Sequence, residues 1–278
     1  MYHDWASRVR RCAEPLRTWR RTGANVSNVL AITGEVSLFG LRAVKDVFRR
    51  PFEGEQIRRQ LAEIGSRSLP LVIASGFALG AVLTMHTRTT LVTFGATAWV
   101  PNVQALAFFL EIGPLVTGLL VAGRVGSGIG AVLSNMRATE QIDAIESLSI
   151  DSFKYLVVPR IVACTLALPL LTLFLDFSGL LGGFLFEYVA AHASFGLYIS
   201  QSFSSFDWPN FYPPTLKTAV FGFIIGTVSS FLGYTTNEGA RGVGRAATRS
   251  VVISSLLIIT IDVLLIKLIF FIFPESAL

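Results

Sequence analysis

Two charged residues inside an apolar run are the first feature of this sequence that could do chemistry. Glu111 and Arg124 both lie in the apolar stretch from about 103 to 133. A charge at membrane depth costs on the order of 3 kcal/mol, so such residues usually face a cavity, a partner or water. A helix rises 1.5 Å per residue, which puts the two about 20 Å apart on one helix, too far to pair. Each needs another polar environment, unless Glu111 lies close enough to the membrane surface to be solvated.

A serine among glycines is the strongest candidate nucleophile. Ser127 lies in the run Gly126–Gly130, and His86 and His192 are possible bases. However, Val125 stands where a G-x-S-G motif needs glycine, and nothing in the sequence places a base beside the serine. The glycines also lack a preceding strand and a following lysine, which argues against a nucleotide-binding loop. We expect no catalytic residue and no metal site; an intramembrane serine protease is the enzyme alternative.

A small residue recurs at every fourth position along the same run. Such a face allows the backbones of two membrane helices to approach closely. It therefore predicts helix packing or a dimer contact. The face consists of Gly118, Ala122, Gly126, Gly130 and Ser134.

A polar segment follows this apolar run. Within 135–149, Glu140, Asp143 and Glu146 recur at three-residue steps with isoleucines between them. This spacing predicts a short helix that is too polar to cross a membrane. It is either a solvated loop helix or a docking helix for a cytoplasmic partner.

Further charges lie in later apolar runs. Lys217 and Lys267 have stems long enough to carry their charges to a membrane surface. Asp262 lies near the middle of its run, so we expect it to hydrogen-bond within a helix bundle or to pair with a lysine. Asp176 is a similar case.

Composition shows which elements must position these residues. The chain of 278 residues is 52% hydrophobic and 15% charged, with mean hydropathy +0.61; soluble domains carry about 25% charged residues. The cysteines, Cys12 and Cys164, are far apart and indicate neither a disulfide nor a metal site. We expect an all-α integral membrane protein with five transmembrane helices, because a span needs about 20 apolar residues. The predicted spans are about 69–87, 103–133, 155–186, 216–236 and 251–273.

The distribution of basic residues predicts the orientation. More than half of the 23 Lys and Arg precede residue 68, and the loop from Tyr188 to Pro214 has none. The positive-inside rule then places the N-terminus and the loops 134–154 and 237–250 in the cytoplasm. With five spans, the C-terminus lies on the far side.

The first 67 residues form a basic region without a continuous apolar core. Apolar residues recur near helical spacing from Val26 to Phe48, and Ile57, Leu61 and Ile64 repeat the pattern. This predicts amphipathic helices lying on the cytoplasmic face of the membrane. A basic tail that only assists membrane insertion fits residues 1–25 about as well. We therefore divide the chain into an N-terminal region, 1–67, and a membrane domain, 68–278.

Four motifs carry a resemblance to a known family. The 50-residue stretch EIGPLVTGLLVAGRVGSGIGAVLSNMRATEQIDAIESLSIDSFKYLVVPR, 111–160, closely resembles the hallmark region of MlaE/YrbE permeases. These are the membrane subunits of MCE-associated ABC transporters. The similarity continues in LALPLLT at 166–172, LKTAVFG at 216–222 and GYTTNEGARGVGRAATRSVV at 233–252. It covers roughly residues 65–273.

The resemblance implies a partner set. The family's permeases are homodimers of five-span chains, each preceded by an interfacial helix, with a lipid cavity between the two copies. A periplasmic MCE-protein assembly lies above them. Two cytoplasmic ATPases lie below and bind ATP and Mg, so no cofactor is expected in this chain. A nucleic-acid partner is not expected either. The expected location is the bacterial inner membrane.

The resemblance also implies residue roles. The family's E-[LI]-G-P glutamate corresponds to Glu111, near the lipid cavity with Leu110 and His86. Its A-G-R motif corresponds to Ala122, Gly123 and Arg124. Its coupling helix corresponds to Met136–Glu146, where ATPase contact is expected of Met136, Arg137, Thr139, Glu140, Gln141, Asp143 and Glu146.

The chain departs from the family pattern at three positions. Leu110 stands where many members have Arg, Val132 where many have Glu, and His86 where Gln is common. The departures indicate either a different lipid or pairing with a non-identical subunit. The expected function is still lipid transport, with phospholipid as the first expectation and another hydrophobic compound as the alternative. A structural scaffold is a third reading.

Overall fold

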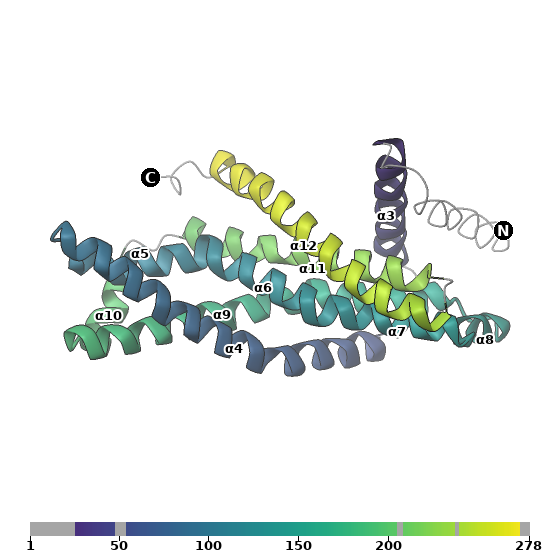
Figure 1. Ribbon diagram of the computed structural model, residues 1–278, viewed down its shortest axis with the longest axis horizontal. Coiled ribbons are helices and arrows are strands. Elements are labelled where there is room, and N and C mark those ends of the chain that lie inside the picture. The colour runs from purple at the N-terminus through teal and green to yellow at the C-terminus, as the bar shows by residue number, and fades with distance from the viewer. Residues whose placement is uncertain (1–25, 48–53, 205–207, 237–238, 273–278) are drawn as a thin grey trace. The chain divides into compact units, whose positions relative to one another are not determined.

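The computed structural model describes residues 26–47, 54–204, 208–236 and 239–272. Their regular structure is helical (Figure 1). Three segments, η2, η3 and η4, are π-helical turns, which occur most often at functional sites. The elements are α3 Val26–Val47, α4 Gly54–Thr93, η1 Thr97–Trp99, α5 Val100–Ala107, η2 Phe108–Ile112, α6 Gly113–Val121, η3 Ala122–Gly126, α7 Ser127–Ala138, α8 Gln141–Ser147, η4 Phe153–Val157, α9 Val158–Ala191, α10 Phe195–Ser202, α11 Trp208–Tyr234 and α12 Gly239–Ile272.

Five helical segments are long and apolar enough to cross a membrane. This confirms the predicted five-span, all-α membrane protein, because each segment contains or overlaps one predicted span. The second segment is built from η1 through α7, and the third from η4 and α9. The segments are Gly54–Thr93, Thr97–Ala138, Phe153–Ala191, Asn210–Tyr234 and Gly239–Ile272.

The start of the first span differs from the sequence prediction. Ile57, Leu61 and Ile64 were expected in a separate interfacial helix, but they belong to α4, which continues without interruption to Thr93. A boundary at 67/68 therefore falls inside one helix. Of the predicted interfacial region, α3 is a separate helix, and residues 1–25 lie outside the described part of the chain.

The predicted coupling helix is also divided differently. Met136 and Arg137 belong to the last turn of α7, and the separate helix α8 begins at Gln141. Glu140 between them has a left-handed backbone (φ 59°), which a continuous right-handed helix does not tolerate. The expected single helix over 136–146 is therefore two helices joined by a turn.

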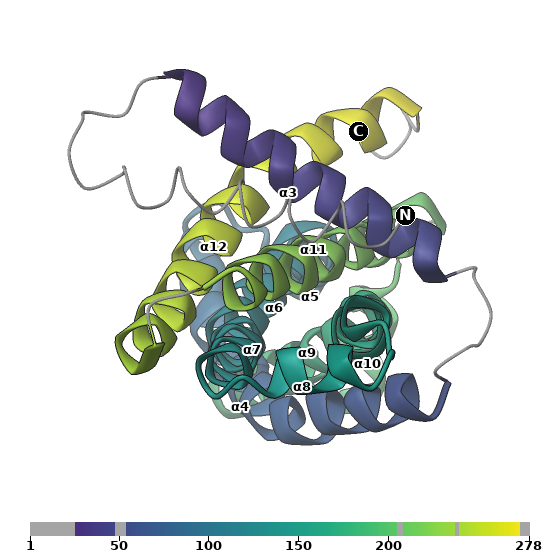
Figure 2. The ribbon, with the colours of Figure 1, turned by 90° about the vertical axis from the view of Figure 1, so that its right-hand side faces the viewer.

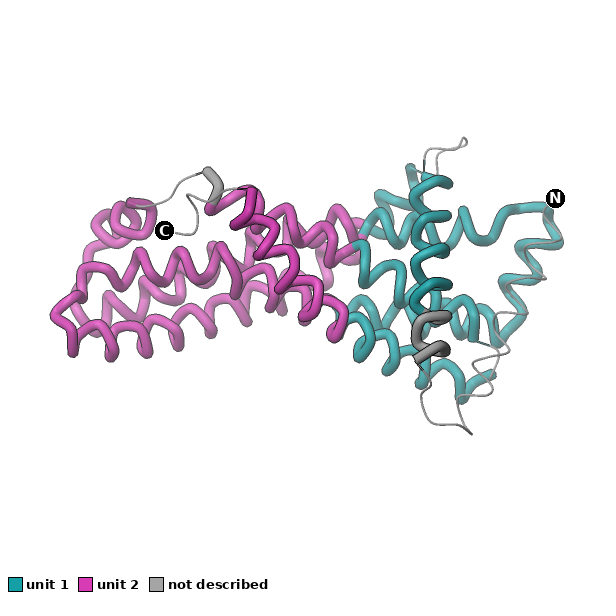
Figure 3. Tube along the Cα trace, turned by 90° about the horizontal axis from the view of Figure 1, so that it is seen from above, with its two compact units in different colours: residues 1–60, 122–163, 223–254 teal, residues 61–121, 164–222, 255–278 magenta. Residues whose placement is uncertain are grey.

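The chain divides into two compact units (Figure 3). Unit 1 comprises Met1–Gln60, Ala122–Ala163 and Phe223–Ser254. Unit 2 comprises Leu61–Val121, Cys164–Gly222 and Ser255–Leu278. The helices α4, α9, α11 and α12 each contribute one segment to each unit, and the units are described separately below.

An aromatic cluster anchors α3 in unit 1. The Phe39 ring contacts the rings of Phe153 and Phe231 at centroid distances of 4.9 and 5.4 Å, both edge to face. Gly40 allows α3 to cross α11 closely (Figure 2), since a Cβ there would lie 3.1 Å from the Phe223 ring. The opposite face of α3 exposes Leu38, as expected of a helix lying in a membrane surface.

Glycines allow α4 and α9 to touch in unit 2. A Cβ on Gly80 would collide with the backbone of Gly179, and one on Gly182 with the backbone of Phe77. Neither position can therefore accept a larger residue without separating the helices. Gly179 also seats the ring of Phe108, which is fully buried. The second span is thus fixed against the third beside its π-helical turn.

Candidate functional site

The π-helical turn Phe108–Ile112 in unit 2 carries Glu111, and the chain continues through Gly113 and Pro114. Proline has no N–H, so the carbonyl of Leu110 lacks its usual donor four residues on. Lys217 of α11 replaces that donor, with its Nζ 3.1 Å from the carbonyl oxygen. The local sequence therefore creates one acceptor for the lysine.

Two carboxylates lie against the ammonium of Lys217. Its Nζ donates to Glu111 Oε2 at 2.9 Å and forms an ion pair with Asp262 Oδ1 at 2.9 Å. The side chains of Lys217 and Asp262 are 2% and 4% exposed, whereas that of Glu111 is 39% exposed. The cluster is therefore buried on two sides and open at Glu111.

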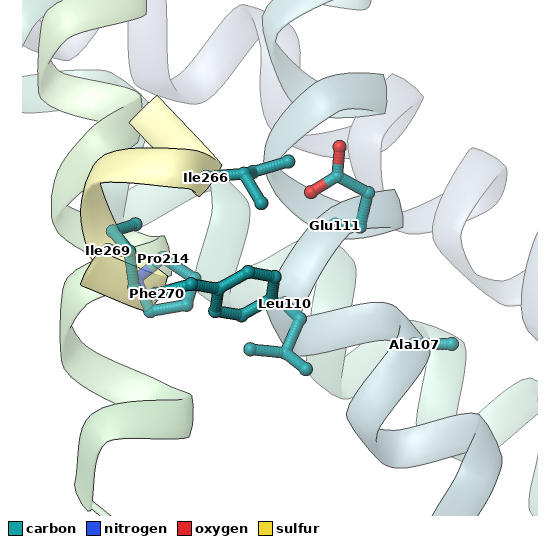
Figure 4. Close-up of a pocket in the computed structure, with 7 residues that line it drawn as sticks. All are labelled: Ala107, Leu110, Glu111, Pro214, Ile266, Ile269 and Phe270. Carbon is teal, nitrogen blue, oxygen red and sulfur yellow. The ribbon is translucent and has the colours of Figure 1, made fainter. Parts of the chain in front are cut away.

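This open side faces an apolar pocket of about 350 Å³ (Figure 4). Glu111 is the one charged residue among those lining it, and its carboxylate lies beside Ile266. Small-molecule sites commonly combine such apolar walls with a few polar groups that fix orientation. The lining residues are Ala107, Leu110, Glu111, Pro214, Ile266, Ile269 and Phe270.

The structure brings together some of the predicted cavity and polar residues. Glu111 and Leu110 line the pocket, and His86 does not; it lies exposed on α4. Lys217 does not extend to a membrane surface, because it is buried between two acids. Asp262 pairs with Lys217. Pairing with a lysine was one of the two arrangements expected for this acid.

The other intramembrane polar residues lie outside this cluster. Arg124 is exposed in the π-helical turn Ala122–Gly126 of unit 1. Asp176 of unit 2 is fully buried and rests against Gly113, and its carboxyl oxygens have no hydrogen bond to any described residue. Ser127 donates to the backbone carbonyls of Gly123 and Arg124, at 2.5 and 3.1 Å. Both acceptors are backbone carbonyls of the same helical segment, so neither is a base that could activate the hydroxyl.

A buried amide in unit 2 was missed by the sequence reasoning. Gln104 is fully buried; it donates to the carbonyls of Gly80 and Gly179, each at 3.3 Å. Its Oε1 accepts from Tyr198 Oη at 2.9 Å and from the Thr84 hydroxyl. The amide therefore joins α4, α5, α9 and α10. Its only sequence signal is a polar residue in an otherwise apolar run.

An ion pair accompanies this amide. Arg88 of α4 lies 2.6 Å from Glu187 of α9, whose side chain is 6% exposed. Burial and the charge of Glu187 raise the pKa of Tyr198 above its usual range, so its hydroxyl stays a donor. The ion pair joins α4 to α9 near their ends, and Tyr198 joins α10 to α5 through Gln104.

The small-residue face packs inside the chain. In unit 2, a Cβ on Gly118 would lie 3.2 Å from the Phe221 ring. In unit 1, one on Gly126 would lie 3.0 Å from Ser229 Oγ, and one on Gly130 would lie 2.5 Å from Ser250 Oγ. Ala122 and Ser134 are fully buried. This face contacts α11 and α12, so a second copy would contact other surfaces.

The predicted coupling residues lie around α8 in unit 1. Thr139, Glu140 and Gln141 are exposed at its start. Arg137 donates to Asp143 at 2.8 Å across the turn. Ile142 is fully buried and fixes the helix to the unit.

Glu146 near the end of α8 is bonded within the chain. Its Oε1 accepts from Ser152 Oγ at 2.7 Å and from Tyr234 Oη at 3.2 Å. The predicted coupling acids therefore differ. The structure shows no side-chain hydrogen bond from Glu140 to a described residue, whereas Glu146 bonds to Ser152, which precedes η4, and to Tyr234 at the end of α11.

Comparison with known proteins finds permeases that match most of the chain. The family model described as "Permease MlaE" matches residues 57–268. A "Probable ABC transporter permease protein" of Rickettsia bellii is 39% identical over 237 residues, 85% of this chain and 92% of the relative. The "Intermembrane phospholipid transport system permease protein MlaE" of Haemophilus influenzae is 30% identical over 234 residues, 84% of this chain and 89% of the relative. The chloroplastic protein TRIGALACTOSYLDIACYLGLYCEROL 1 of Arabidopsis thaliana is 33% identical over 196 residues, 70% of this chain and 56% of the relative.

Proposed function

Since the chain belongs to the MlaE family of ABC-transporter permeases, we propose that the transporter it serves moves phospholipid. The relative from Haemophilus influenzae is named for phospholipid transport. This chain is the permease subunit and not the enzyme of that system. ATP and Mg would be bound by a separate ATPase.

One observation carries the choice of a lipid. The pocket has apolar walls on α5, α11 and α12 and a single charged wall residue, Glu111. Apolar walls suit acyl chains, and a half-exposed carboxylate suits a headgroup with hydrogen-bond donors. Lys217 holds that carboxylate in place, and Asp262 pairs with the lysine.

The complete transporter would contain several partners. We propose two copies of this permease, two cytoplasmic ATPases and a periplasmic MCE-protein assembly, in the bacterial inner membrane. The N-terminus would be cytoplasmic, because the basic residues concentrate there. Most of the apolar surface of α12 is uncovered within the chain, so it is available to lipid or to a second copy.

Coupling would pass through α8. The helix is too polar to span a membrane, and its first residues are exposed where an ATPase could contact them. Movement of α8 on ATP hydrolysis would then alter the spans to which it is bonded. This gives the permease a mechanical role without catalytic residues.

Photocrosslinking from the pocket tests the substrate. A photoreactive residue replaces Ile266 in the assembled complex, and adducts are identified by mass spectrometry in the nucleotide-free and vanadate-trapped states. We expect a phospholipid adduct that falls several-fold on trapping. The control position is Leu181, an exposed residue of α9 outside the pocket, which should meet bulk lipid equally in both states. A different hydrophobic compound at Ile266 would contradict phospholipid as substrate, and equal adducts in both states would contradict the pocket.

A further inference from the structure

We propose that Glu146, Ser152 and Tyr234 form a latch through which α8 moves the fourth span. Glu146 would then be a positioning residue inside the permease and not an ATPase contact. The inference rests on the proposed function, because ATPase docking on α8 is itself a proposal. All three residues belong to unit 1.

The three side chains form a closed triangle of short contacts. Ser152 Oγ donates to Glu146 Oε1 at 2.7 Å, and Tyr234 Oη lies 2.8 Å from Ser152 Oγ and 3.2 Å from Glu146 Oε1. Two hydroxyl protons thus serve one carboxylate. Hydrogen bonds to a charged acceptor are roughly twice as strong as neutral ones. The triangle therefore joins α8, the residue before η4 and the end of α11.

Aromatic packing holds the tyrosine in position. Ser152 and Tyr234 are 2% and 7% exposed. The Tyr234 ring lies 6.4 Å from the ring centroids of both Phe39 and Phe153. The two phenylalanine rings lie together on one side of the tyrosine ring, since their own centroids are 4.9 Å apart. This packing and the burial of Tyr234 limit the movement of its ring, so a pull on Glu146 would reach the end of α11.

The segment after α8 is fixed by two more elements of unit 1. Arg42 of α3 lies 4.3 Å from the centroid of the Phe153 ring and 3.9 Å from Asp151. Gln56 of α4 donates to Tyr155 Oη at 2.9 Å. These contacts hold the beginning of the third span, whereas Glu146 connects α8 to the end of α11 through Tyr234.

The two ends of α8 explain how it could move as one body. Glu140 before it and Ser149 after it both have left-handed backbones, at φ 59° and 62°. Such residues cost about 1 kcal/mol each or more, and they occur often in switch regions. Between them lies a helix of two turns, so a force on Glu140 or Gln141 would be carried to Glu146.

The test uses the assembled permease–ATPase complex in vesicles of phosphatidylethanolamine and phosphatidylglycerol. Tyr234→Phe removes one hydroxyl and keeps the ring, and Tyr155→Phe is the matched control in the same unit. Three quantities are measured: ATPase co-purification, transfer of NBD-labelled phosphatidylethanolamine per ATP hydrolysed, and amide hydrogen exchange with and without vanadate trapping.

We expect Tyr234→Phe to retain the ATPase and to lose the trapping-dependent change in exchange at residues 228–236. Transfer per ATP should fall about tenfold, the scale of one lost hydrogen bond to a charged group. Glu146→Gln should behave alike, and the double variant should be no worse than either single one. Tyr155→Phe loses the bond from Gln56 but leaves the latch intact, so it should retain the trapping-dependent change in exchange at residues 228–236.

Three results would overturn the latch. Exchange that rises equally in both states of Tyr234→Phe, with the trapping-dependent change intact, would mean that Tyr234 only supports the fold. Loss of the ATPase in Glu146→Gln but not in Tyr234→Phe would place Glu146 at the docking surface. A wild-type chain that retains no ATPase would refute the proposed coupling and the latch with it. If the wild type shows the exchange change but moves no labelled lipid, the proposed substrate fails and the latch stands.

Discussion

The ion cluster of unit 2 and the acidic helix α8 of unit 1 both contain carboxylates, but the partners of these carboxylates differ in the two units. In unit 2, Lys217 lies between two acids, one of them buried and one half-exposed. In unit 1, Asp143 is itself exposed and pairs with Arg137, and Glu146 has two neutral donors. Burial makes the first arrangement depend on the pair of Lys217 and Asp262, whereas solvent can replace the contact of the exposed Asp143 in the second. Loss of the buried pair should therefore cost much more stability than loss of the pair on α8.

Removal of the shared cation should give the largest effect. Lys217→Met would leave Glu111 and Asp262 facing each other without a counter-ion. Breaking a buried pair by removing one partner costs about 3–5 kcal/mol. We expect a large loss of thermal stability in detergent, measured by fluorescence size-exclusion chromatography after heating. Lys217→Met with Asp262→Asn should recover part of it, and an unchanged melting curve for the single variant would refute the cluster's role.

Neutralising the open acid should separate transport from stability. Glu111→Gln leaves the pair of Lys217 and Asp262 intact, so stability should change by about 1 kcal/mol. Transfer of labelled phospholipid should fall about tenfold if the carboxylate contacts the headgroup. Glu55→Gln, at an exposed glutamate of α4, should leave transfer unchanged. Equal transfer in both variants would remove Glu111 from the substrate site.

Charge reversal at the start of α8 should affect assembly alone. Glu140 is exposed, so Glu140→Lys should leave the melting curve of the permease within about 0.5 kcal/mol of the wild type. We expect weaker recovery of the ATPase in a pull-down. Glu63→Lys, at an exposed acid of α4, is the control. Full recovery of the ATPase with Glu140→Lys would argue against docking at this end of the helix.

The smallest effect should come from the exposed pair in unit 1. Arg137→Gln breaks the contact with Asp143, whose side chain is 46% exposed. Surface ion pairs contribute about 0–1 kcal/mol, so the unfolding midpoint should hardly move. A loss comparable to that of Lys217→Met would mean that the two regions do not differ as their burial indicates.

The span pattern could be predicted from sequence because apolar length alone decides it. Glu111 could be identified as a candidate site residue because it is a charge in an apolar run. Its partners could not, because Lys217 and Asp262 reach it only after three helices pack. Gln104 was missed because one polar residue in an apolar run does not reveal how many carbonyls will surround it.

Breaks in a helix and the direction that a helical residue faces were harder to predict than the spans. Glu140 stops a helix through a left-handed backbone without being glycine, so no residue type announces the stop. His86 was placed near the lipid cavity from its position in a motif; it is exposed on α4 and does not line the pocket beside Glu111. Both cases concern backbone geometry and the rotation of a helix, which periodicity in one sequence does not specify.

The unbroken course of α4 has a consequence for how the protein sits in a bilayer. Its 40 residues extend about 60 Å, twice the roughly 30 Å of a hydrocarbon core. Its early turns carry Arg58, Arg59 and Arg67, which belong at the headgroups or beyond. Pro70, at a position where a helix commonly bends, separates these basic turns from the apolar turns that follow. A membrane of different thickness would then be accommodated by a change in the tilt of the apolar part of α4.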